Sequence, residues 1–355
     1  ARQHQQADQH TDSDASTCIG PVPDSTGVVA AVVVITHNRP EYLKKCMSSV
    51  MQVHVKDPSH RQKFPLHISQ DGNNTAVTDL ARSTDPAKFN MSHMDLSLIL
   101  PVVHMQHVMA DTFPTRKKTE PAAYYRIASH YKFVMRQIFD CWQYPKLIVL
   151  EDDMQIAVDF FSYFEAGAKL LDDDPKLYSV SSWNDHGQAR HVNDPLRLER
   201  SDFFPGLGWM LTNAVWQSLK GNWPAAYWDD WMRLSPPVKL NDVAVDWSKQ
   251  DLDYLQRHRY AEELDQKVAS ARLLKSSEGV HLAQGLVKMT YGSRSEYEEL
   301  AAAVDIIGDW KDGVPRASYE GIVKVRLSVL QDEGYSFLGG ECLLVPASEV
   351  MSPTT

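Results

Sequence analysis

The sequence predicts an α/β protein with a mostly parallel central sheet, and three observations support this. Apolar runs such as "VVAAVVVITHNRP" at 28–40 are continuous rather than alternating, which is typical of strands buried on both faces. Segments with helical spacing lie between these runs, and 123–139 is the clearest. Several runs end directly in polar residues. Strands that alternate with helices form βαβ units and therefore a mostly parallel sheet flanked by helices.

Five apolar segments are predicted to form the strands of this sheet: 28–40, 64–72, 96–103, 146–153 and 177–185. A helix is expected over 123–139, where Ile127, Tyr131, Val134 and Ile138 recur at helical spacing. A second helix is expected over 158–171.

The pattern changes after about residue 235, and this divides the chain. We expect a flexible polar lead-in over 1–27 and one large domain over 28–235. A charged helix at 252–269 is followed by a predicted strand at 285–293, a helix at 295–310 and a strand at 319–330. These elements suggest a small C-terminal α+β appendage over 236–338, followed by a loose tail over 339–355.

Composition and charge narrow the class of protein. The 355 residues carry a formal charge of -10, which argues against a nucleic-acid partner. An anionic substrate would need a metal ion or a few placed cations. The four cysteines contain no CxxC pair, so a zinc site is not expected, and disulfides and free thiols both remain open. No segment is long and apolar enough to span a bilayer, and no signal peptide is visible. Because the chain begins with Ala1 rather than Met, we expect that an upstream targeting segment is simply missing from this sequence.

Polar residues follow the predicted strands where a ligand crevice is expected in such sheets. Glu151, Asp152 and Asp153 form an acidic triplet directly after "LIVL". Hard divalent cations such as Mg²⁺ or Mn²⁺ prefer such oxygen ligands and need only one or two carboxylates when a phosphate supplies the rest. The alternative is a solvated acidic turn that caps the next helix.

Two later segments are rich in aromatic residues. In "PAAYWDDWMR", Asp229 and Asp230 lie beside Trp228, and shielding from water can raise the basicity of a carboxylate. They could also be ordinary aspartates at a helix N-terminus. In "SDFFPGLGWML", the two glycines permit a close backbone approach to a ligand, or form a tight core turn.

Three further residues are candidates for ligand contacts, each with an ordinary structural alternative. Arg39 could pair with an anion or be a surface cation. Asp71 could accept hydrogen bonds from a base or sugar, or make an Asx turn. His130 could be a ligand contact, although a lone histidine beside an apolar stripe is more often a core residue. Together these residues suggest a pocket for a nucleotide diphosphate with a metal, a few polar contacts and one remote base.

Four segments resemble the N-acetylglucosaminyltransferase I family: "LIVLEDDMQIAVDFFSYF", "SSWNDHG", "RSDFFPGLGWML" and "WPAAYWDDWMR". The similarity extends from 31–46 to 312–323 and includes several rare tryptophans. This family transfers GlcNAc from UDP-GlcNAc to the 2-hydroxyl of a mannose in the N-glycan core, forming a β-1,2 linkage. The resemblance implies a Rossmann-like GT-A fold, Mn²⁺ dependence, inversion at the anomeric carbon and a Golgi-lumen enzyme whose membrane anchor is absent from this chain.

The resemblance also implies roles for individual residues. "EDD" matches the family's form of the DxD motif, with Asp153 as the metal ligand and Glu151 and Asp152 as substrate-binding residues. Asp229 matches the catalytic base. The remaining matched residues contact the donor, through its UDP portion at Arg39, Asp71 and His130 and around the transferred sugar at Leu207 and Trp228. The implied partners are UDP-GlcNAc and a mannose-terminated glycan.

The chain departs from the family's pattern in two places. Where the family often has two cysteines, this chain has His37 and Gly72. After "DDWMR", the family continues with a loop that closes over the donor, whereas here "LSPPVKLNDV" at 234–243 joins almost directly to the later region. A missing lid would weaken donor binding and expose the site to water. The missing lid motivates one alternative, a catalytically impaired protein that binds a sugar nucleotide or glycan. The other alternative is transfer to protein O-mannose, which the sequence hardly separates from transfer to an N-glycan.

Overall fold

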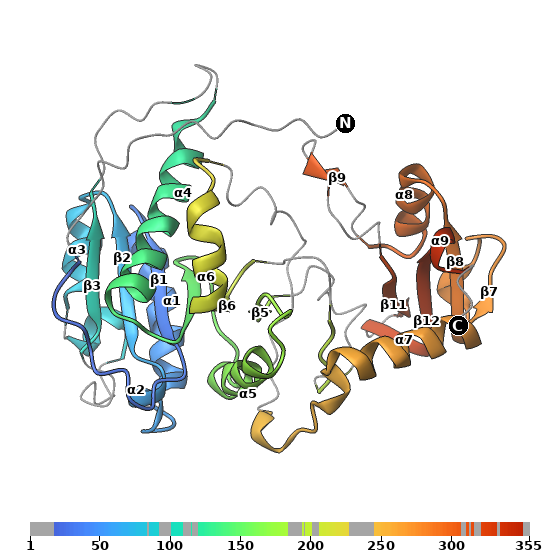
Figure 1. The fold of residues 1–355 in the computed structure, drawn as a ribbon, viewed down its shortest axis with the longest axis horizontal. Helices are drawn as coiled ribbons and strands as arrows, with labels where there is room; N and C mark the ends of the chain where they lie inside the picture. The colour runs from blue at the N-terminus through green and yellow to red at the C-terminus, as the bar shows by residue number, and fades with distance from the viewer. Residues whose placement is uncertain are drawn as a thin grey trace.

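The structure is a computed structural model of the chain. It describes residues 18–83, 85–91, 101–108, 115, 120–183, 194, 196–200, 206–226, 245–306, 310–311, 314–315, 321–331 and 334–350. Figure 1 shows a first region, drawn in blue to yellow, that contains a six-stranded sheet, and a second region, drawn in orange to red, that contains a four-stranded sheet. Among the described residues, no helix combines the length and apolar character that a bilayer crossing requires.

The first sheet has the strand order β3-β2-β1-β4-β6-β5. Its strands are β1 (Ala31–Thr36), β2 (Leu66–Asp71), β3 (Val103–His107), β4 (Lys146–Glu151), β5 (Val180–Ser181) and β6 (Trp209–Thr212). The four strands β1 to β4 pair in parallel, while β6 is antiparallel to both β4 and β5. The prediction of an α/β protein with a mostly parallel central sheet is confirmed.

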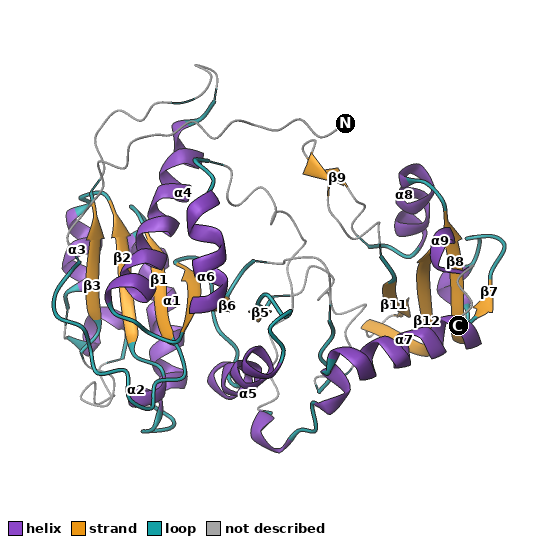
Figure 2. Ribbon diagram, viewed as in Figure 1, coloured by secondary structure: helices purple, strands orange, loops and turns teal. Residues whose placement is uncertain are grey.

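Helices cover both faces of this sheet, as Figure 2 shows. Ala31 and Val33 of β1 pack in one core cluster, and Val32 and Val34 pack in the other. Successive strand side chains point to opposite faces, so a strand covered on both sides must be apolar at every position. One face is covered by α1 (Pro40–His54), α3 (Thr75–Ala81) and α5 (Phe160–Asp173), and the other by α4 (Ala122–Met135) and α6 (Asn213–Leu219).

Helix α1 begins at Pro40, directly after the polar residues that follow β1. Proline suits the first turn of a helix because its missing N–H would have no helical partner there. Leu43, Met47 and Val50 are fully buried against the sheet, so one apolar stripe fixes the helix in place. The start of α1 therefore lies at the carboxyl end of β1, and Arg39 is its N-cap residue.

The segment that precedes the first strand is attached to the first region. A disulfide joins Cys18 to Cys141, which ends the π-helical turn Arg136–Cys141 after α4. The backbone N–H of Ile19 donates to Gln137 at 3.0 Å, and Trp142 Nε1 donates to the Ile19 carbonyl at 2.8 Å. The prediction of a flexible lead-in over 1–27 is therefore wrong for the segment that begins at Cys18.

Two predicted strands differ from those observed. Strand β3 begins at Val103, whereas we expected a strand over 96–103, of which 96–100 lies outside the described residues. Of the strand expected over 177–185, only Val180–Ser181 forms β5. The expected domain boundary at 235 also lies outside the described residues.

The second sheet has the order β11-β12-β8-β7. The elements of this region are α7 (Arg257–Ser270), β7 (Arg272–Leu273), β8 (Gly285–Tyr291), α8 (Arg294–Ala303), β9 (Trp310–Lys311), β10 (Val314–Pro315), β11 (Val323–Gln331), β12 (Gly334–Pro346) and α9 (Ala347–Val350). The predicted loose tail from Gly339 is wrong, because β12 is a central strand whose residues Leu343, Leu344 and Val345 are fully buried.

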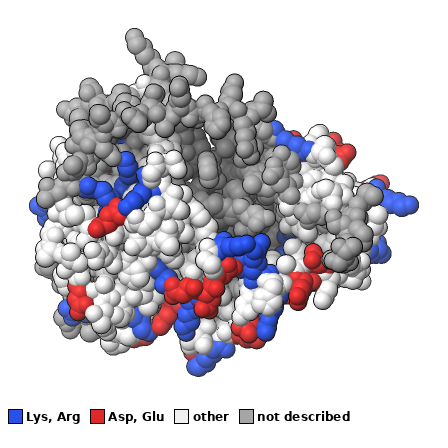
Figure 3. Space-filling view, viewed as in Figure 1, with Lys and Arg blue, Asp and Glu red and all other residues white. Residues whose placement is uncertain are grey.

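Charged side chains tie the two regions together. Glu199 accepts a hydrogen bond from Tyr260 at 2.8 Å and pairs with Lys324 of β11. Arg200 pairs with Asp174, the C-cap residue of α5, and also donates to the carbonyl of Leu255, just before α7, at 2.8 Å. Figure 3 shows acidic and basic side chains gathered along the lower edge of the molecule, around α5 and the start of α7.

Candidate functional site

The carboxyl ends of β1 and β4 lie side by side where the strand order reverses. From β1 the chain adds β2 and then β3 on one side, and β4 then joins the other side of β1. Ile35 pairs with Glu151 in the parallel register, so the residues after both strands leave the sheet at the same point. Ligands of open α/β sheets bind in the crevice outside such a point.

Asp152 is the anchored member of the acidic triplet. Its side chain is 2% exposed, and its Oδ2 accepts a hydrogen bond from Thr36 Oγ1 at 2.8 Å. Its Oδ1 pairs with the guanidinium of Arg39. Burial raises the pKa of Asp152 above its ordinary value, even though the contacts with Thr36 and Arg39 act in the opposite direction.

The other two carboxylates of the triplet point to different partners. Glu151 accepts a hydrogen bond from the Tyr131 hydroxyl at 3.0 Å, on the α4 side of the sheet. Asp153 is 40% exposed, and its Oδ2 lies 3.1 Å from Arg39 Nη1. Separate partners reduce the repulsion among the three acids, and they leave Asp153 as the most accessible carboxylate.

Arg39 bridges Asp152 and Asp153 from the start of α1. Its side chain is 44% exposed, and its guanidinium carbon lies 4.9 Å from the centroid of the Tyr42 ring. The planar guanidinium has several donors in a fixed fork, so one arm can bind each carboxylate. The predicted anion contact is therefore paired with two carboxylates in this structure.

Asp71 lies at the end of β2 and is held by histidines. His107, its register partner on β3, donates from Nδ1 to Asp71 Oδ1 at 2.8 Å. His37 donates from Nδ1 to the Asp71 carbonyl at 2.8 Å, which links the ends of β1 and β2. Burial alone would raise the pKa of Asp71, but the hydrogen bond from His107 and the nearby histidines outweigh it and the pKa lies below its usual value.

His37 and Gly72 are in contact across the same two strand ends. A Cβ at Gly72 would lie 3.4 Å from His37 Cε1, and the φ of +81° at Gly72 favours glycine. At the two positions where the family often has cysteines, this chain therefore has a ring packed against a glycine.

His130 lies behind His107 rather than at the surface. Its Nε2 is 2.8 Å from Ser69 Oγ, and its ring stacks on that of His107 with centroids 5.5 Å apart. Burial lowers the pKa of His130 to about 3, so the imidazole is neutral near pH 7. His130 thus has the environment of a core histidine, one ring away from Asp71.

Leu207 lies in a tight turn beside the acidic triplet. Its carbonyl accepts a hydrogen bond from Ser181 Oγ at 3.1 Å. Gly208 has a φ of +55°, and a Cβ there would lie 2.4 Å from Ser182 Oγ and 2.9 Å from Met154 Cε. Glycine is required here because the backbone approaches both the loop after β4 and the end of β5.

Two of the predicted site residues, Trp228 and Asp229, lie outside the described residues. Among those described, no group of three or more His, Cys, Asp or Glu side chains is arranged to hold a metal ion. A metal at this edge would therefore need further oxygen ligands from a substrate or water.

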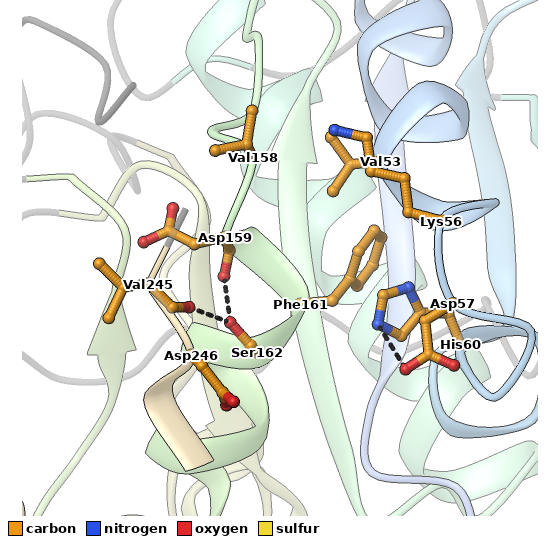
Figure 4. Close-up of a pocket in the computed structure, with 10 residues that line it drawn as sticks. All are labelled: Val53, Lys56, Asp57, His60, Val158, Asp159, Phe161, Ser162, Val245 and Asp246. Carbon is orange, nitrogen blue, oxygen red and sulfur yellow. Dashed lines mark hydrogen bonds and ion pairs between the residues drawn. The ribbon is translucent and has the colours of Figure 1, made fainter. Parts of the chain in front are cut away.

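A hollow of about 290 Å³ lies elsewhere, between the C-terminal end of α1 and the start of α5. Figure 4 shows Asp57 paired with His60 on one side, and Ser162 donating to the carbonyls of Asp159 and Val245 on the other. The hollow is at the amino edge of the sheet, because His60, which lines it, packs against Phe64, two residues before β2 begins at Leu66. It contains none of the predicted site residues.

Three residues that hold the candidate site were not predicted to do so from the sequence. Thr36 supports Asp152, Tyr131 supports Glu151, and His107 supports Asp71. Thr36 could have been found from its position at the end of the first predicted strand, whereas His107 lies beyond the strand predicted at 96–103. Tyr131 was assigned only to the apolar stripe of its helix.

These features define a class: a mixed α/β protein with ligand-type side chains at the switch point of a parallel sheet. The sequence model of the GNT-I family matches residues 4–237 and 234–331, and this chain belongs to that family. The chain is 40% identical over 336 residues to a protein of Arabidopsis thaliana named alpha-1,3-mannosyl-glycoprotein 2-beta-N-acetylglucosaminyltransferase. That match covers 84% of this chain and 72% of the relative.

The two family matches meet at residues 234–237. The predicted shortening of the chain after "DDWMR" lies at the same place.

Proposed function

We propose that the chain is an inverting N-acetylglucosaminyltransferase of the GT-A type. It moves GlcNAc from UDP-GlcNAc to the 2-hydroxyl of a mannose in an N-glycan, forming a β-1,2 linkage. Membership of the GNT-I family and the 40% identical relative support a transferase with a nucleotide-sugar donor and a glycan acceptor. The parallel sheet with its ligand-type residues at the switch point is compatible with a GT-A fold.

One observation carries the proposal for the site. The triplet that resembles the DxD motif lies at the switch point, with Asp153 and Arg39 both partly exposed there. Asp153 can thus supply a ligand for a cation, and the guanidinium of Arg39 beside it can donate hydrogen bonds to phosphate oxygens. Asp71, held by His107, offers a carboxylate for hydrogen bonds from the nucleoside.

The residues present fit Mn²⁺ only in the company of a diphosphate. Asp153 can supply one carboxylate oxygen, and the described residues form no larger ligand group. Hard divalent ions often bind through one or two carboxylates plus substrate phosphates and water. Mn²⁺ bound in this way would neutralise negative charge on the departing UDP.

The protein's own residues then have distinct tasks. Asp229 accepts the proton of the mannose 2-hydroxyl while the hydroxyl oxygen bonds to the anomeric carbon, on the face opposite UDP. The bond from that carbon to the β-phosphate oxygen breaks, and UDP leaves with the electron pair. Arg39 and Asp71 bind the UDP portion, with His130 behind Asp71. Glu151 and Asp152 support the metal end, and Leu207 and Trp228 pack around the GlcNAc.

We place the enzyme in the Golgi lumen, with an N-terminal anchor outside this chain. The disulfide between Cys18 and Cys141 supports an oxidising compartment, because such bonds are rare where thiols are kept reduced.

The replacement Asp229→Asn tests the proposed base. It removes proton acceptance but keeps the size of the side chain, so UDP should bind with unchanged affinity in calorimetry with Mn²⁺. Turnover of UDP-GlcNAc with a mannose-terminated N-glycan should fall by about a hundredfold or more. Unchanged turnover would exclude Asp229 as the base.

A second candidate is a protein that binds a sugar nucleotide or glycan with little turnover. The two family matches that meet at 234–237 favour it, because a shortened loop would leave the donor exposed. Calorimetry with UDP-GlcNAc and Mn²⁺, followed by a UDP-release assay, separates the two functions. UDP-GlcNAc binding without UDP release, on both N-glycan and O-mannose acceptors, would support the second candidate. UDP release with the O-mannose acceptor alone would show that the enzyme transfers GlcNAc to O-mannose and not to an N-glycan.

A further inference from the structure

The proposed metal ligand already has a cation beside it. Arg39 Nη1 lies 3.1 Å from Asp153 Oδ2, while the other arm of the same guanidinium pairs with Asp152. The acidic loop after β4 is thus partly neutralised by the protein itself.

The two ion pairs of Arg39 differ in how firmly they are held. Asp152 is 2% exposed and is fixed by the hydrogen bond from Thr36, so the inner pair is sheltered from water. Arg39 and Asp153 are 44% and 40% exposed, so the outer pair faces solvent. Solvent-exposed ion pairs contribute little stability, and the outer pair can therefore be exchanged at low cost.

We propose that Arg39 is a positioning residue that occupies Asp153 until a diphosphate binds. In the free protein it disfavours a divalent ion at Asp153, and on nucleotide binding it turns its outer arm to the phosphates and releases the carboxylate. This inference rests on the proposed function. It adds that the order of assembly is set by one side chain, with the nucleotide required before the metal binds tightly.

Electrostatics gives the direction of this effect. A guanidinium within hydrogen-bond distance of a carboxylate repels a dication that approaches the same carboxylate, and at so short a distance the repulsion remains appreciable even with the screening typical of a protein surface. A diphosphate offers the fork several oxygens in suitable geometry, so the guanidinium has a better outer partner when UDP is present. Metal and nucleotide must then strengthen each other's binding by the same factor.

This inference can be tested by titrating the protein with Mn²⁺ in the absence of nucleotide and measuring the bound ion by electron paramagnetic resonance. Glutamine at this position can still donate a hydrogen bond but carries no charge. Arg39→Gln should therefore bind Mn²⁺ at least about tenfold more tightly than the unaltered chain, since one unit charge at this distance is removed. Arg39→Lys keeps the charge, so its Mn²⁺ affinity should stay weak.

The same titration in the presence of UDP separates this inference from the proposed function. The unaltered chain should bind Mn²⁺ tightly once UDP is added. If it does, but Arg39→Gln shows no gain without UDP, the role of Arg39 is refuted and the proposed function stands. If the unaltered chain binds no Mn²⁺ even with UDP, the proposed metal site itself is refuted.

A second measurement leaves Arg39 unchanged, in case its replacement impairs folding. Asp153→Asn frees the outer arm of Arg39 and removes one negative charge near the phosphates. UDP should then bind several-fold more tightly than to the unaltered chain when a chelator keeps all metal away. The double replacement with Arg39→Gln should lose most of that gain, and equal or weaker UDP binding by Asp153→Asn would contradict the proposal.

Discussion

The carboxyl edge of the central sheet has two halves that hold their carboxylates in different ways. After β1 and β4, Arg39 bridges two carboxylates, and the outer pair faces solvent. After β2 and β3, Asp71 is held by His107, and His130 stacks behind it as a buried neutral ring. His37 joins the two halves through the Asp71 carbonyl.

The difference indicates which half changes when a ligand binds. The exposed ion pair between Arg39 and Asp153 can exchange partners, so a charged ligand can enter there at little cost. The carboxylate of Asp71 is held by a sheltered hydrogen bond, so it can act as a preformed acceptor. One half is suited to a diphosphate with its metal, and the other to the nucleoside.

The largest expected effect is at the half after β1 and β4, which contains Arg39 and Asp153 and which we call the charged half. Asp153→Ala should lower turnover by about a thousandfold, since a catalytic metal is worth several kcal/mol of charge stabilisation. Folding should be unaffected because this side chain is 40% exposed. Asp79→Ala, a change of the same type at an exposed position on α3, should leave the UDP-release rate nearly unchanged. If Asp153→Ala kept full activity in a chelator, the metal role would be wrong.

A smaller effect is expected at the half after β2 and β3, which contains Asp71 and His107 and which we call the histidine half. His107→Phe removes the hydrogen bond that lowers the pKa of Asp71. UDP affinity should fall about tenfold at neutral pH, which is the loss expected when one hydrogen bond to a charged group is removed. The pKa of Asp71 should rise, so UDP binding should also be lost at a higher pH as the solution is acidified.

Calorimetry between pH 7.5 and 5 would measure both changes. His107→Asn is the matched control, because its amide N–H can still donate to Asp71. If His107→Phe bound UDP like the unaltered chain across this range, His107 would have no positioning role.

The smallest expected effect concerns stability alone. Burial lowers the pKa of His130 to about 3, whereas an exposed histidine has a pKa near 6.5, so unfolding takes up a proton between these values. The stability present above pH 6.5 is therefore lost as the pH falls. His130→Gln should reduce this loss by about 1.4 kcal/mol per pH unit.

Urea unfolding at pH 7 and pH 5.5 would measure this slope. His54 and His67 are also buried with lowered pKa values, but they remain in both proteins, so the difference reports on His130 alone. An equal slope in both proteins would show that His130 is charged or exposed in the folded state.

The charged half could be predicted from sequence because its strands are unmistakable. Both β1 and β4 are continuous apolar runs that end in polar residues, and the parallel pattern places those ends at one edge. Which acid is anchored and which is exposed could not be predicted. That depends on Thr36 and Tyr131, which come from β1 and from α4.

The histidine half was only partly predictable. Strand β3 is an edge strand whose residues "VHMQH" alternate in burial, so the apolar run at 96–103 appeared to be the better strand. Misplacing the strand hid His107, the register partner of Asp71. Strand β12 was missed because its apolar residues are buried by residues far away in the sequence, in the two core clusters that Leu343 and Leu344 join.

A crystal structure of the chain with UDP and Mn²⁺ would test the central claim most directly. We predict a manganese ion coordinated by Asp153 and the diphosphate. Arg39 should be turned to the phosphates, and the nucleoside of UDP should lie beside Asp71. Nucleotide bound instead in the hollow near His60, with Arg39 still bridging Asp152 and Asp153, would contradict the account.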